Sequence, residues 1–225
     1  MDRRFGRLRA AAAAVVLAGA MLASGGCLRE MLTTAGYLIN GTDVPAEFAG
    51  LRNKKVVLVC RPLVGLQYRD AGAARDLALQ IGKLLVKHDP KIKVVDQQKV
   101  LAWADEHAWE DYCQVGRALG ADMVIGIDVT AFNLVDGPTL YRGRASLEVK
   151  VYDLSKAKDQ EVVFEKSLPQ AVYPADSIGS VPISEYSEPE FRHRFVLVLA
   201  DQIGRFFYAH DAYTNPGSDP TGGLY

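Results

Sequence analysis

The side chains of this sequence that could do acid–base or metal chemistry are few and scattered. Asp122 and Asp128 lie six residues apart in an apolar run, which would place both carboxylates on one face of a strand. Carboxylates at the start and the far end of a strand also serve as turn and cap acceptors, and this second interpretation is the more economical one. The four histidines, none of which forms an i, i+4 pair, are His88, His107, His193 and His210.

The motifs of common enzymes and metal sites are absent. The sequence has no GxSxG, no GxGxxG after a strand, no phosphate-binding loop, no HExxH and no CxxC. We therefore expect a non-catalytic protein without cofactor or metal ion. The alternative is a periplasmic hydrolytic or ligand-binding domain with a pocket at the strand ends, which would need buried titratable groups converging in a cleft.

Cys27 is the residue whose context is most informative. Four arginines, an alanine-rich apolar run and the small residues Ser24-Gly25-Gly26 precede it. This order is typical of a bacterial export signal, and the apolar run is shorter than the roughly 20 residues of a transmembrane helix. The segment resembles a lipoprotein signal, which implies that Cys27 becomes the acylated first residue of the mature chain.

Two other interpretations of this segment stay open. An ordinary signal peptidase could cleave nearby, which would leave Cys27 a plain thiol, or the segment could remain as an uncleaved anchor. The usual lipoprotein pattern has leucine three residues before the cysteine, where this chain has Ser24. Leu28 rather than aspartate follows Cys27, and the resemblance to sorted lipoproteins then favours the outer membrane, with the protein facing the periplasm.

Cys60 and Cys113 are the two remaining cysteines. The compartment implied by the signal is oxidising, so a disulfide between them is allowed. Each also lies in an apolar run where a free thiol would pack as a small hydrophobe. The spacing of the two cysteines in the sequence does not decide between a disulfide and two free thiols.

The charge of the chain excludes nucleic acid as a partner. Residues 1–26 hold four arginines and one aspartate, so their removal changes the formal net charge from −1 to −4. A nucleic-acid-binding domain is instead basic, with its positive side chains clustered on one face.

The hydrophobic pattern predicts the elements that position these residues. Continuous or alternating apolar runs favour strands at 55–61, 92–96, 121–135, 140–154 and 161–168, whereas three–four spacing favours helices at 70–87, 97–107, 109–119 and from Ser187 onward. The order β-α-β-α-β-β-β-α predicts an α/β fold with a single mixed sheet and helices packed on it. Gly126, in mid-strand, indicates a bulge or the close approach of a helix.

We divide the chain into four parts. These are a signal peptide (1–26), a mostly irregular tether (27–53), an α/β envelope domain (54–210) and a disordered tail (211–225).

The passage 113–129, CQVGRALGADMVIGIDV, resembles a group of envelope proteins, and KVVLV and KVVDQQKV upstream follow the same order. The group comprises the curli secretion-channel subunit (CsgG-like), the LpoB-type activators of peptidoglycan synthases and the N-terminal domain of TolB. The resemblance implies a domain that binds and assembles. The short charged hairpin around 136–139 disfavours a CsgG-like membrane barrel, and the tether is much shorter than the LpoB-type arm.

Aromatic residues mark two candidate partner-binding surfaces. The first is the loop 173–186, which carries Tyr173 and Tyr186 between prolines. The second is the region of Trp103 and Trp109, for which core packing is the plainer interpretation. We therefore expect a lipid-anchored envelope lipoprotein that acts as an accessory or assembly factor for an unidentified envelope protein. A ring-forming oligomer without a membrane barrel is a further alternative.

Overall fold

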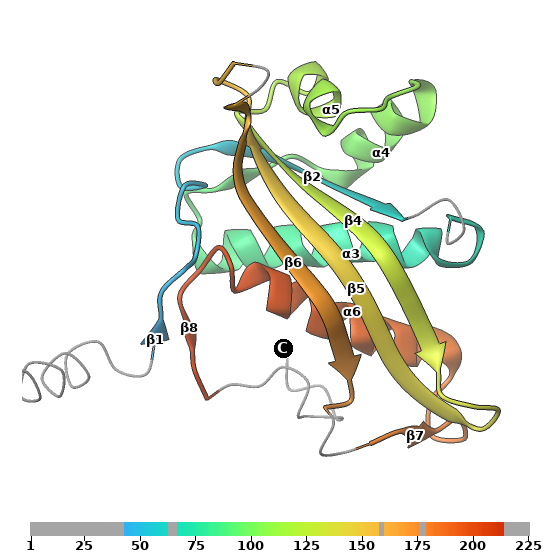
Figure 1. The fold of residues 1–225 in the computed structure, drawn as a ribbon. Coiled ribbons are helices and arrows are strands. Elements are labelled where there is room, and N and C mark those ends of the chain that lie inside the picture. Colours follow the sequence, from blue (N-terminus) through green and yellow to red (C-terminus); the bar gives the residue numbers. More distant parts are fainter. Residues whose placement is uncertain (1–42, 63–66, 158–159, 176–178, 214–225) are drawn as a thin grey trace, which may run out of the picture. The chain divides into compact units, whose positions relative to one another are not determined.

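The computed structural model describes residues 43–62, 67–157, 160–175 and 179–213 (Figure 1). The signal segment, Cys27 and most of the expected tail lie outside these ranges. None of the helices in the described part combines the length and the apolar composition that crossing a membrane requires.

A mixed six-stranded sheet is the centre of the fold, in the order β3-β2-β4-β5-β6, with β7 paired to β5. The strands are β2 (Lys55–Pro62), β3 (Lys93–Val94), β4 (Met123–Val135), β5 (Leu140–Asp153), β6 (Val162–Tyr173) and β7 (Val181–Pro182). Both β3 and β4 run parallel to β2, whereas β5, β6 and β7 are antiparallel to their neighbours. The short strands β1 (Asp43–Val44) and β8 (His210–Asp211) form a separate pair. The expected α/β class with one mixed sheet is confirmed.

Helices cover both faces of the parallel half of the sheet (Figure 1). On one face, α3 (Gln67–His88) and α6 (Glu188–Gly204) pack in the main core with Leu58 and Ile125. On the other face, α4 (Gln97–Glu106) and α5 (Tyr112–Ala118) form a smaller core with Val57, Val59 and Val124. From β2 the chain passes through α3 to β3 on one side of β2, and from β3 it passes through α4 and α5 to β4 on the other side. Because these two crossovers run in opposite directions across the sheet, right-handed connections place their helices on opposite faces.

Three expected boundaries differ from the structure. The end expected for the strand at 161–168 is wrong, because β6 continues through Pro169 to Tyr173. An edge strand tolerates proline, since the missing N–H can face away from the ladder. The end of the expected tether is packed: Leu51 is 1% exposed, and the Phe48 ring lies 5.5 Å from the Phe164 ring. The expected tail begins with Asp211, which β8 includes.

Candidate functional site

A cavity of 520 Å³ lies at the carboxyl end of β2. Its floor is the end of β2, from Leu58 to Arg61, while α3 and α4 supply the two walls and Trp109 closes one side. In open α/β sheets, ligands usually bind outside the carboxyl ends of the parallel strands. We call this cavity the β2 groove.

Arg61 is the charged residue of the groove floor, and Asp128 holds it in place. The two face each other in the register of β2 and β4, and Arg61 Nε donates to Asp128 Oδ1 at 3.1 Å. The hydroxyl of Tyr112, at the start of α5, donates to the same oxygen at 2.7 Å. One carboxylate therefore orients side chains from a neighbouring strand and from the helix above the sheet.

Two aromatic rings flank the guanidinium of Arg61. Its central carbon lies 5.0 Å from the centre of the Tyr112 ring and 5.9 Å from that of Trp109. Both distances are within the range of a cation–π contact, so the rings and the carboxylate restrict this cation to one orientation. The groove thus combines a fixed positive charge with an apolar aromatic wall.

The thiol of Cys60 and the phenol of Tyr112 keep their protons at neutral pH. Burial, with a smaller contribution from the negative charge of Asp128, raises the pKa of Cys60. Burial and the hydrogen bond to Asp128 likewise raise the pKa of Tyr112. Neither side chain therefore offers a nucleophile or a base near neutrality, because the thiolate is the reactive form of cysteine.

The residues expected to bind a partner have different environments. Trp109 lines the β2 groove, whereas Trp103 packs into the smaller core and stacks on His107 at 4.6 Å. Tyr186 is half-buried beneath Arg194, whose guanidinium lies 4.6 Å from the ring centre. Tyr173 is only 2% exposed, and its ring lies 5.4 Å from that of Phe191. The strand alternation of β6 directs Tyr173 toward α6, so its expected role on a binding surface is wrong.

The disulfide that the sequence allows between Cys60 and Cys113 is not formed. Both residues are free cysteines, with Cys60 on β2 and Cys113 buried on α5. Of the two carboxylates considered for acid–base chemistry, Asp122 accepts from the backbone N–H of Lys55 at 2.7 Å, and Asp128 is engaged with Arg61. The interpretation of Asp122 as a strand-start acceptor is confirmed.

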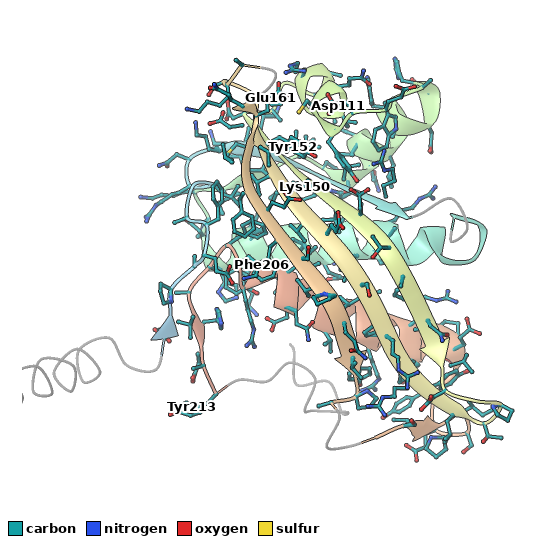
Figure 2. All side chains as sticks on the ribbon, in the orientation of Figure 1. Asp111, Lys150, Tyr152, Glu161, Phe206 and Tyr213 are labelled. Atoms are coloured by element: carbon teal, nitrogen blue, oxygen red, sulfur yellow. The ribbon has the colours of Figure 1, made fainter. Side chains whose placement is uncertain are left out.

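A second polar cluster lies where α5 meets the start of β6 (Figure 2). One donor atom each from Asp111, Cys113 and Glu161 lies within 4.8 Å of the other two, a donor set that could hold a metal ion. The Arg117 guanidinium binds Glu161, and burial together with the charge of Asp111 raises the pKa of Cys113 to about 12. The sequence gives no signal for this cluster, because Asp111 and Glu161 are fifty positions apart.

No protein-family model matches the sequence, and no curated protein matches it. Solved structures with similar chains include a PelC dodecamer from Paraburkholderia phytofirmans, at 12% identity and a TM-score of 0.44, over 74% of this chain and 95% of that one. Lipoprotein GNA1162 from Neisseria meningitidis is 14% identical, with a TM-score of 0.37, over 71% of this chain and 99% of that one. At these values the matches assign this chain to no family.

Proposed function

We propose that this protein is a non-catalytic binding protein of the bacterial envelope, anchored by lipid on Cys27, and that a segment of a partner protein docks in the β2 groove. The observation that carries the proposal is the fixed arrangement of Arg61 and Trp109 at the end of a groove whose walls are built mainly from small and aliphatic side chains, with Arg75 and Asp105 among them. Tryptophan and arginine dominate the binding energy of protein interfaces when they are held in place around a pocket.

The protonation states of the groove support binding over catalysis. The raised pKa values of Cys60 and Tyr112 leave both groups neutral, and Asp128 already accepts hydrogen bonds from Arg61 and Tyr112. A general base needs an accessible site for the incoming proton and a pKa near the working pH. The hydrogen bonds among these side chains instead fix their conformation, which is what a pre-organised binding surface requires.

Cell location rests on the sequence around Cys27. Acyl chains on this residue would hold the protein on a membrane, since each buried methylene contributes about 0.8 kcal/mol. The outer membrane and a periplasmic orientation are part of the same proposal.

Filling the groove tests the docking site. Ala104 lies on the groove wall and is half-buried, so Ala104→Arg would place a long side chain in the cavity. Ala102 is exposed on the same helix, does not line the groove, and gives the matched control Ala102→Arg. Envelope complexes would be cross-linked in living cells and recovered with each variant.

We expect Ala104→Arg to lower partner recovery about tenfold, which corresponds to roughly 1.4 kcal/mol of binding free energy. Ala102→Arg should recover the partner as the unmodified protein does, and circular dichroism should show both variants folded. Equal recovery with the two variants would show that the partner docks elsewhere.

A further inference from the structure

The edge of β2 that faces β3 carries a hydrogen-bond ladder that stops early. Lys93 N–H donates to the Lys54 carbonyl at 3.0 Å, and Val95 N–H donates to the Val56 carbonyl at 2.9 Å. This spacing of two residues places the next rung between the backbone N–H of residue 97 and the Leu58 carbonyl. That rung cannot form from the backbone, because α4 begins at Gln97 and turns the chain away.

The side chain of Gln97 takes the place of the missing rung. Its Nε2 donates to the Leu58 carbonyl at 3.2 Å in a buried position. The amide of Gln97 therefore occupies the position that the N–H of a longer β3 would occupy. A buried carbonyl without a partner is costly, which explains why an amide side chain stands here.

Beyond this point no strand of the described residues lies beside this edge of β2. Within the described ranges, β3 pairs with β2 only at Lys55 and Val56. Peptide groups alternate between the two edges of a strand, so the N–H and the carbonyl of Cys60 face the same edge as the carbonyl of Leu58. This part of the edge is the floor of the β2 groove.

The walls of the groove leave room beside the strand. Small side chains of α3, Ala74 and Ala78, form one wall, and Val100 and Ala104 of α4 form the other. Helices on both faces with a strand between them are the normal surroundings of a buried parallel strand. The groove therefore has the surroundings of a strand that the described part of the chain does not supply.

We propose that the partner segment binds in extended conformation, as a strand added to the edge of β2, and displaces the Gln97 amide from the Leu58 carbonyl. This inference rests on the proposed function of the groove. Main-chain hydrogen bonds then give affinity, as in other cases of strand addition. Trp109 and Arg61, at the end of the groove, select the side chains of the segment.

The probe is the tightest-binding decapeptide selected from a phage-displayed random library on the full-length protein in detergent. Its affinity is measured by fluorescence anisotropy for the wild type, for the groove-filled Ala104→Arg and for the control Ala102→Arg. Each amide of the decapeptide is then N-methylated in turn. Methylation removes a donor, so a strand-bound peptide should lose about tenfold in affinity at every second position over its bound part.

A second arm replaces Gln97 by alanine. In the proposed mode the peptide no longer competes with the amide for Leu58, so Gln97→Ala should bind the decapeptide about threefold to tenfold more tightly. Gln98 is exposed next to it, and Gln98→Ala should leave the affinity unchanged. If the Gln97 side chain instead contacted the bound peptide, Gln97→Ala would weaken the binding of the decapeptide.

The outcomes separate the two proposals. Binding that Ala104→Arg abolishes, with a period-two methylation pattern, supports strand addition. Binding that Ala104→Arg abolishes without such a pattern overturns strand addition and leaves the groove as the docking site. Failure to select any peptide that is sensitive to Ala104→Arg overturns both proposals.

Discussion

Asp128 is the residue on which the groove depends most. It accepts one hydrogen bond from Arg61 and one from Tyr112 through the same oxygen, and these two donors come from different layers of the fold. A hydrogen bond to a charged acceptor contributes more than one between neutral groups. The position of Arg61 between its two rings follows from this carboxylate.

Replacement of Asp128 by alanine should lower the free energy of unfolding by about 1–3 kcal/mol, because the buried Tyr112 hydroxyl loses its acceptor. Urea unfolding followed by circular dichroism measures this change. Glu148 lies directly opposite Asp128 on β5, is exposed and carries the same charge. Glu148→Ala should stay within about 0.5 kcal/mol of the wild type. Equal effects of the two substitutions would contradict the role given to Asp128.

The thiol of Cys60 gives a pH-dependent prediction. Because burial and the charge of Asp128 raise its pKa, only a small fraction is thiolate at neutral pH. Alkylation of Cys60 by iodoacetamide should therefore be slow and should keep accelerating up to about pH 10, where an exposed cysteine has already reached its plateau. Peptide-mapping mass spectrometry gives the rate at each pH.

Removing the negative charge should lower the pKa of Cys60, so Asp128→Asn should alkylate faster than the wild type at the same pH. A plateau near pH 9 in the wild type would show that the thiol titrates as an exposed group does and would refute the predicted shift.

Sequence reasoning found some residues of the site and missed others for a physical reason. Trp109 was a candidate because aromatic residues are rare and cluster at interfaces. Arg61 and Asp128 are 67 positions apart and meet only because β2 and β4 pair in this register. The sequence predicts Tyr173 in a loop because the apolar alternation ends at residue 168, whereas β6 continues through Pro169 and includes Tyr173.

At the scale of elements, the contact between α5 and β4 holds the Tyr112 hydroxyl against Asp128. Gly126 lies in mid-strand beneath the Tyr112 ring, and a Cβ at this position would come within 2.7 Å of Tyr112 Cδ2. The expectation of a close approach by a helix at Gly126 is confirmed. Glycine is needed here because any side chain would lift Tyr112 away from Asp128.

Gly126→Ala should therefore lower the free energy of unfolding by about 1–3 kcal/mol, the usual cost of overpacking a core. Gly72 in α3 is the matched control, because nothing lies within 4 Å of a Cβ built there. Gly72→Ala should raise the stability by about 0.5–1 kcal/mol, since alanine is the better helix former. Thermal unfolding of both variants measures the contrast, and a Gly126→Ala protein as stable as the wild type would contradict the packing argument.

At the scale of the whole molecule, the two halves of the sheet have different surroundings. The parallel half, β3-β2-β4, has helices on both faces and holds the groove at its carboxyl end. The order of the elements was predictable from hydrophobic periodicity. The central place of β2 and the open edge beyond β3 were not, because strand pairing and the early end of β3 depend on contacts far apart in sequence.

If lipid on Cys27 anchors the protein, both acylation and membrane attachment should depend on this residue. Metabolic labelling with a fatty-acid probe should mark the wild type. The Cys27→Ala protein should carry no label and should no longer be found in the membrane fraction. A soluble, unlabelled wild type would mean ordinary secretion instead. Persistent label in Cys27→Ala would place the acyl group on another residue.

The docking of a partner in the β2 groove is tested most directly by photo-cross-linking in living cells. A benzoylphenylalanine is introduced at position 105, which lines the groove but is exposed at its rim, and separately at position 102, exposed on the same helix and outside the groove. We predict a discrete cross-linked protein from position 105 and none from position 102, with mass spectrometry locating the bond in one short segment of the partner. Adducts that are absent at 105, or the same at both positions, would contradict the account.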